Sequence, residues 1–93
     1  MTIDIEGKCG SFAENKDQAR EIRETVIKPS FKNKKSVTLD FTGVDSSTQS
    51  FIHALISGFF QEHGEIALSR LRFKGCNKAV QSIITTVVNY SLE

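Results

Sequence analysis

The 93-residue sequence contains no tryptophan, one proline, one tyrosine and two cysteines. It also lacks long apolar runs, since no uninterrupted apolar stretch exceeds three residues. A membrane-spanning helix needs about 20 apolar residues, and a signal peptide needs a stretch of roughly 7–15. The sequence therefore predicts neither. Two cysteines are too few for a disulfide scaffold, and Cys9 and Cys76 form no CxxC pair. These absences favour a reduced, cytoplasmic setting.

An excess of charge of one sign is also absent. Twelve basic and eleven acidic residues give a net charge of +1, whereas nucleic-acid-binding domains usually have a strong basic excess. Two local basic clusters exist, composed of Lys28, Lys32, Lys34 and Lys35 and of Arg70, Arg72, Lys74 and Lys78. No aromatic residues alternate with them, as single-strand binding would require. The simpler interpretation is that both clusters are solvated surface. The alternative is a nucleic-acid-associated accessory function that uses these Lys and Arg clusters.

The composition, 39% hydrophobic and 25% charged, is that of an ordinary globule. A chain of this length predicts one domain, spanning residues 1–93. Neither His53 nor His63 has a second ligand at the short spacing typical of zinc sites. We therefore expect no metal and no cofactor. Cys9 and Cys76 are expected to be ordinary thiols, with their proximity in space left open.

Three segments alternate apolar and polar residues, as half-buried strands do. The first begins at Ile3 and ends at Gly7, with a turn over 7–10. The second begins at Val37 and ends at Gly43. The third begins at Leu71 and is expected at an exposed edge. Three further segments have apolar residues at helical spacing. They cover residues 13–28, residues 50–63 and the stretch after Asn77.

The ends of these helices carry recognisable signals. The first has two competing starts, Ser11 with Glu14 or Asn15 with Gln18, each with capping-box spacing. Pro29 is expected to stop it. The second has an apolar stripe too wide for a surface helix, with Ser50, His53, Ser57 and Gln61 on its narrow polar side. We expect it to be mostly buried and to end at Gly64. Residues 83–88 are all β-branched, so a strand competes with the last helix.

The resulting order β-α-β-α-β-α predicts an α/β fold, with a small mostly parallel or mixed sheet and helices packed on it. In such sheets, ligands and partners meet the carboxyl ends of the strands. Here that edge includes the polar loop 44–49 and the start of the helix at Ser50.

Ser50 and His53 lie one helical turn apart, like a nucleophile and its base. However, the sequence has no G-x-S-x-G elbow and no evident third member. We therefore predict no catalytic residues and no enzymatic activity. The hydroxyl residues that precede the helix have two interpretations. They either cap its free N–H groups or form a phosphate-accepting or partner-binding site, because a helix N-terminus favours negative charge.

The segment Val37-Thr38-Leu39-Asp40-Phe41-Thr42-Gly43-Val44, followed by a polar gap and Ser50-Phe51 opening an apolar helix, resembles the STAS-like domain of unknown function. This family is a bacterial relative of the anti-sigma-factor antagonists. The resemblance covers roughly residues 9–91. It implies a sheet-and-helix sandwich and a regulatory role in protein–protein interaction, often beside a histidine-kinase-like ATPase that acts as a serine kinase. It implies no defined activity.

In the true antagonists an Asp-Ser-Ser-Gly motif opens the equivalent helix, and the partner kinase phosphorylates a serine there. The resemblance places Thr48-Gln49-Ser50-Phe51 on this motif, with Ser50 at the acceptor position. The sequence departs from the motif at three of its four positions, and Phe51 in place of glycine is expected to narrow access to Ser50. The predicted partner-binding or phospho-acceptor residues are Ser47, Thr48, Gln49, Ser50 and His53.

Overall fold

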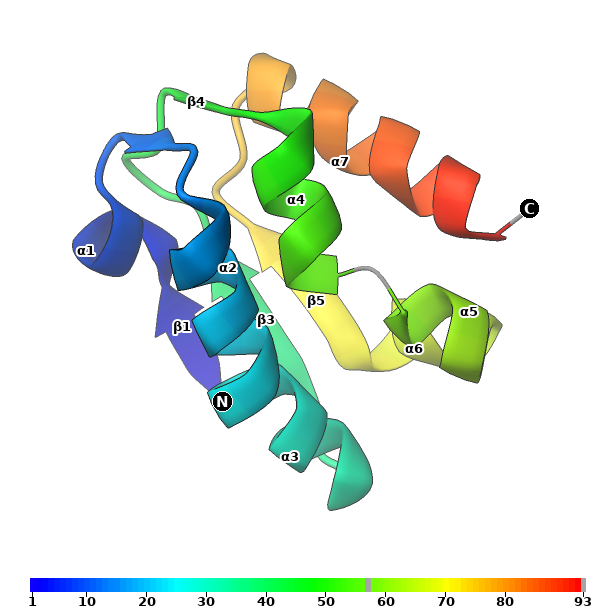
Figure 1. Ribbon diagram of the computed structural model, residues 1–93. Helices are drawn as coiled ribbons and strands as arrows, with labels where there is room; N and C mark the ends of the chain where they lie inside the picture. Colours follow the sequence, from blue (N-terminus) through cyan, green and yellow to red (C-terminus); the bar gives the residue numbers. More distant parts are fainter. Residues whose placement is uncertain (57, 93) are drawn as a thin grey trace.

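The computed structural model describes residues 1–56 and 58–92. Its main sheet has three parallel strands, β1 (Thr2–Asp4), β3 (Val37–Asp40) and β5 (Leu71–Lys74), in the order β1-β3-β5 (Figure 1). A second, two-stranded parallel ladder joins β2 (Phe12–Ala13) to β4 (Ser46–Ser47). The predicted α/β class with a mostly parallel sheet is confirmed, and β5 forms an edge as expected.

The helices occupy the connections between these strands. They are α1 (Ile5–Cys9), α2 (Lys16–Ile22), the π-helical segment η1 (Arg23–Ile27), α3 (Lys28–Lys32), α4 (Gln49–Ile56), α5 (Phe59–His63), α6 (Glu65–Arg70) and α7 (Lys78–Leu92). Right-handed crossovers between successive strands of this order place α2 and α4 on the same face of the sheet. The two helices pack together in front of the sheet, and α7 packs against α4 (Figure 1). No helix among the described residues is both long and apolar enough to cross a membrane.

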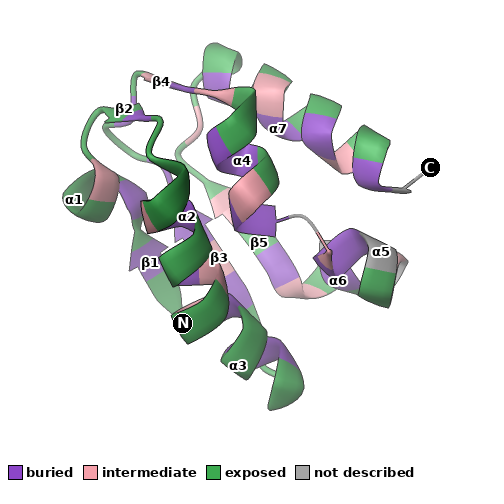
Figure 2. Ribbon diagram, in the orientation of Figure 1, coloured by how far each residue is buried: buried purple, intermediate pink, exposed green. Residues whose placement is uncertain are grey.

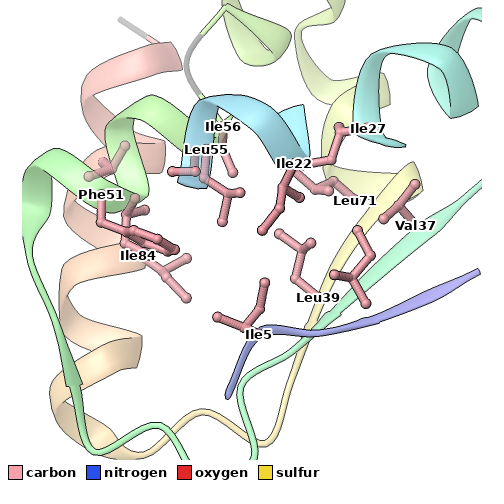
Figure 3. Packing of buried hydrophobic residues seen from close by; sticks show 14 of the residues in the cluster. Ile5, Ile22, Ile27, Val37, Leu39, Phe51, Leu55, Ile56, Leu71 and Ile84 are labelled. Carbon is pink, nitrogen blue, oxygen red and sulfur yellow. The ribbon is translucent and has the colours of Figure 1, made fainter. Parts of the chain in front are cut away.

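The core fills the space between this helical layer and one face of the sheet (Figure 2). Ile3, Leu39 and Phe73 share one row of the parallel register. The side chains of Val37, Leu39 and Leu71 meet those of α2, α4 and neighbouring segments in the buried cluster (Figure 3). The opposite face of the sheet carries only polar side chains: Thr2, Asp4, Thr38, Asp40, Arg72 and Lys74. The fold therefore buries one face of its sheet.

The N-terminal segment differs from the prediction. The first strand ends at Asp4 instead of Gly7, and residues 5–9 form α1 in place of the expected turn over 7–10. The reason is local, because the Asp4 carboxylate accepts a hydrogen bond from the Gly7 N–H at 3.1 Å. A side chain that caps in this way satisfies a free donor of the first turn and starts a helix.

The next helix begins at the second of the two predicted starts. The Asn15 side chain accepts from the N–H groups of Asp17 and Gln18, at 2.9 and 3.2 Å. The prediction that Pro29 stops the helix was wrong, since helical structure continues to Lys32. Proline lacks an N–H and its ring disturbs the preceding turn. The wider π turn of η1, in which the Lys28 N–H bonds to the Arg23 carbonyl, accommodates this disturbance.

The helix predicted over 50–63 is interrupted. It forms α4 and α5, and between them Gly58 has a φ of +89°, a conformation that glycine adopts without steric cost. Ser57 and the side chain of Gln61, both expected on the polar side, lie outside what is described. The end before Gly64 is confirmed, and a further short helix, α6, follows it.

Residues 83–88, for which the sequence left helix and strand open, are helical and belong to α7. Asn77 starts it as predicted, because its side-chain oxygen accepts from the Val80 N–H at 2.9 Å. Val80, Ile84 and Val87 are buried along one side of α7. Tertiary burial of this stripe outweighs the weak helix propensity of β-branched residues.

The core makes a direct prediction for Phe51, which is fully buried. Replacing Phe51 with alanine should lower the free energy of unfolding by about 3–5 kcal/mol, the usual cost of emptying an aromatic core site. Phe12→Ala is the matched control, because Phe12 is 49% exposed and should lose much less. Urea unfolding followed by circular dichroism measures both. Equal unfolding midpoints for Phe51→Ala and wild type would show that α4 is not buried.

A second prediction concerns the turn that follows β5, where Gly75 lies against Thr42, the second residue after β3. Gly75 has a φ of +69°, and a Cβ there would lie only 2.8 Å from the main-chain nitrogen of Thr42. Gly10 has a similar φ of +82° with nothing within 4 Å of that position. Gly10, with a ψ of −178°, has a backbone conformation that is essentially restricted to glycine, so Gly10→Ala should cost only that backbone strain, about 1–3 kcal/mol. Gly75→Ala should cost clearly more, because its Cβ would also clash. Equal losses in urea unfolding would contradict this close approach.

Candidate functional site

The carboxyl ends of the three main strands form one edge of the sheet, where Asp4, Asp40 and Lys74 lie in the same row of the register. The Asp40 carboxylate accepts hydrogen bonds from the hydroxyl and the N–H of Thr42, at 2.6 and 3.0 Å. These two bonds hold the pKa of Asp40 below its ordinary value. They also fix the direction in which the chain leaves β3 and turns towards β4.

The segment that leads from this edge to α4 is held from two sides. On one side, the Ser11 carbonyl accepts from the N–H groups of Asp45 and Ser46, at 2.8 and 3.3 Å. On the other side, the Asn77 amide donates to the carbonyls of Val44 and Asp45, at 3.3 and 2.7 Å. Asn77 therefore caps α7 and anchors this segment at once. Its second role was missed from the sequence, where only the cap has a recognisable spacing.

Ser47, predicted in the site, lies in the interior. Its side chain is buried, and its hydroxyl donates to the Ala13 carbonyl at 2.9 Å. The Thr48 N–H donates to the same carbonyl at 3.1 Å. Ser47 therefore locks β4 onto β2, and its hydroxyl is not at the surface. The two-residue strand at Phe12–Ala13 was also missed, because it is too short to show an alternating pattern.

Thr48 is the N-cap of α4. Its hydroxyl accepts from the Phe51 N–H at 3.1 Å, and its carbonyl accepts from the Ile52 N–H at 3.2 Å. The capping interpretation of the hydroxyl-rich segment is thus correct for Thr48. Because its hydroxyl is engaged and its side chain half-buried, Thr48 supports the start of the helix instead of presenting a free group.

Gln49, Ser50 and His53 are the exposed members of the predicted site. They share the outer side of the first turns of α4, while Phe51 points into the core (Figure 3). The expectation that Phe51 narrows access to Ser50 was therefore wrong. Successive residues of a helix point about 100° apart, so a bulky side chain directed into the core leaves its neighbour uncovered. We call Gln49, Ser50 and His53 the Ser50 surface.

The chemistry of the Ser50 surface follows from its position. The first N–H groups of a helix have no partner within it, and the peptide dipoles add partial positive charge there. No hydrogen bond joins Ser50 to His53 in the described part of the chain. Among the described residues, no three His, Cys, Asp or Glu side chains are grouped so that they could hold a metal ion. The exposed hydroxyl thus lies at a helix end that tolerates added negative charge.

The cysteines lie apart from this surface. Cys9 belongs to α1, next to β1, whereas Cys76 follows β5, and β3 separates the two strands. Each lines a different cleft, and both are free thiols. Burial raises the pKa of both thiols, and the carboxylate of Asp40 adds to the effect at Cys76. The two residues are thus not partners in a disulfide.

The two basic clusters also lie on different elements. The first runs from the start of α3 into the turn after it, and its Lys28 bonds to the Glu24 carboxylate at 3.1 Å. In the second, Arg72 and Lys74 lie on the polar face of β5. Asp40, on the neighbouring strand β3, is in the same row as Lys74. Neither cluster forms part of the Ser50 surface.

Most of the elements that build this site lie in the part of the chain that matches a family model. A family model described as a STAS-like domain of unknown function matches residues 18–81, from within α2 to the first turn of α7. No curated protein and no solved structure matches the chain. The matched range includes β3, the segment held by Ser11 and Asn77, α4 and β5, and it spans more than half of the sequence. The chain therefore belongs to the family of STAS-like domains of unknown function.

Proposed function

We propose that this domain is a non-enzymatic regulatory module that binds a partner protein through the Ser50 surface. The observation that carries the proposal is the contrast within one short segment. The hydroxyls of Ser47 and Thr48 form structural hydrogen bonds, whereas the hydroxyl of Ser50 is exposed at a rigidly held helix end. A preorganised surface loses little conformational entropy when a partner binds.

An exposed aromatic residue near this surface supports the same proposal. Phe12 is 49% exposed and pairs in register with Ser46, three residues before the start of α4. Aromatic residues are enriched at protein interfaces, where they contribute large apolar contacts. Phe12 therefore belongs to the proposed interface, although its position was not predicted from the sequence.

Phosphorylation of Ser50 by a histidine-kinase-like ATPase that acts as a serine kinase is the regulation that the likeness to anti-sigma-factor antagonists suggests. A phosphate would add about −1.5 to −2 charges at pH 7. The helix N-terminus favours such charge by roughly 0.3–1 kcal/mol, so the fold would remain intact. A partner surface that fits a neutral hydroxyl would be repelled. Modification would thus switch binding without unfolding the domain.

Ser50→Asp tests this proposal. We expect its unfolding free energy to stay within about 1 kcal/mol of wild type, while its affinity for a partner co-purified from the native host falls at least about tenfold, or 1.4 kcal/mol. Isothermal titration with the purified partner measures the affinity, and mass spectrometry of the native protein measures modification of Ser50. The expected loss comes from charge placed inside the interface.

Three control variants separate charge, hydroxyl and stability. Ser36→Asp makes the same substitution at an exposed position just before β3 and should bind like wild type. Ser50→Ala should bind nearly normally. Thr48→Ala should lose about 1 kcal/mol of stability through its cap and little affinity. Wild-type affinity of Ser50→Asp, together with unmodified Ser50 in cells, would make this end of α4 a capped terminus and nothing more.

The absence of catalysis is tested separately. Wild type, Ser50→Ala and His53→Ala should all give background rates in broad esterase and phosphatase screens, because a nucleophile and base without an orienting third group lack the usual hydrolytic arrangement. Turnover by wild type that disappears in either variant would show an enzyme and reject the binding module.

A further inference from the structure

The outer edge of β1 carries unpaired main-chain groups. The Met1 carbonyl accepts from the Thr38 N–H at 2.8 Å, so Met1 and Ile3 direct their groups towards β3. In a parallel ladder the residues between them direct theirs to the opposite side. Those residues are Thr2 and Asp4, and no described strand lies beyond β1 in the order β1-β3-β5. The Thr2 N–H and carbonyl and the Asp4 N–H therefore face a free edge.

A groove runs along this free edge. It is a cleft of about 440 Å³, with residues 1–4 along one side and the helical segment η1–α3 along the other. Thr25, Pro29 and Asn33 line it at four-residue spacing, so one helix face borders the groove over roughly 12 Å. Three residues of β1 span about 10 Å. The groove thus has the length of three or four extended residues, and a smaller cleft that shares Lys8, Thr25 and Val26 continues it towards Cys9.

The helical side of the groove is distorted in a way often found at functional sites. The π turn of η1 contributes Thr25 and Val26 to both clefts, and π-bulges occur frequently at such sites. The Thr25 hydroxyl donates to the Glu21 carbonyl at 2.7 Å, which satisfies its polar group within the helix. Val26, which is half-buried, and Pro29, which is exposed, therefore give this side of the groove an apolar character.

We propose that this groove binds an extended segment of a partner protein, which adds a strand to the free edge of β1. The unpaired N–H and carbonyl groups at that edge match those of an extended main chain, as in other β-augmented complexes. This site goes beyond the Ser50 surface, because β1, η1 and α3 contribute no residue to that surface.

The charges that line the groove specify the partner segment further. They belong to Asp4, Lys8 and Lys35, and the Asp4 carboxylate already accepts from the Gly7 N–H. Lys8 follows the carboxyl end of β1, whereas Lys35 precedes β3 at the opposite end of the groove. An occupant with apolar β-branched residues in its centre and acidic residues at both ends complements this arrangement.

The other edge of the sheet differs. Side chains of β5 include Arg72 and Lys74, and basic side chains are a common protection of edge strands. A second copy of the chain placing β5 beside β1 is the competing occupant, since Lys74 would then approach Asp4. The oligomeric state in solution distinguishes this case from a partner peptide.

A library of random octapeptides, displayed and selected on the wild-type domain, tests the proposal. We expect the enriched peptides to have β-branched centres and acidic ends. Thr2→Pro should weaken their binding at least tenfold, because it removes the N–H at the edge, while proline is tolerated on edge strands. Thr2→Val keeps the N–H and should bind like wild type. Fluorescence anisotropy measures the affinities, and circular dichroism and thermal unfolding verify that both variants fold.

Two further variants locate the site. Val26→Asp should also weaken peptide binding, since it places a charge on the apolar side of the groove. Ser50→Asp should leave it unchanged, which separates this site from the Ser50 surface. Enrichment of no peptide, or equal affinity for wild type and Thr2→Pro, would overturn the proposal. A concentration-dependent oligomer that Thr2→Pro abolishes would overturn it too, by assigning the edge to a second copy.

Discussion

The structure depends above all on the burial of one side of α4. Phe51, Ile52, Leu55 and Ile56 are fully enclosed by the sheet and the neighbouring helices. Burying a large apolar side chain contributes about 1.5–3 kcal/mol relative to exposure, so this helix supplies a large part of the drive to fold. The same burial decides which residues of α4 are exposed, because a helix whose apolar side is fixed against the core must turn its polar side outward. Ser50 and His53 are exposed for that reason.

Regular patterns were enough to predict the sheet and most helices. The alternation in Val37–Asp40, the asparagines at 15 and 77, and the apolar spacing in α4 each act through short-range geometry. The misplaced ends have equally physical causes. Pro29 remains inside a helix because a π turn precedes it, and a positive φ at Gly58 divides a continuous apolar pattern. Both effects depend on how the chain packs, which periodicity alone does not contain.

The place of the candidate residues at the start of a buried helix was predictable from the sequence, but the structural role of each was not. The sequence grouped five neighbouring polar residues in one site, and only the resemblance singled out Ser50 among them. The structure distinguishes them by bonds to distant segments. The Ser47 hydroxyl donates to the Ala13 carbonyl, and the carbonyls of Val44 and Asp45 accept from Asn77. Each of these bonds joins residues more than thirty positions apart in the sequence. Only such long-range partners separate the residues that build the helix end from those that remain exposed there. Thr48 is the exception, since its capping bond lies within the usual three-residue spacing.

The two proposed binding sites are connected through a short stretch of chain. From the free edge of β1 the chain passes through α1 into β2, and β2 pairs with β4 immediately before α4. A continuous chain does not by itself couple the two sites. Coupling requires an element that has two arrangements, and each ligand must bind one arrangement more tightly than the other. The β2–β4 ladder is the best candidate for such an element, since it pairs only two residues on each side. Whatever strengthens or loosens that ladder acts on the start of α4, and therefore on the setting of Ser50.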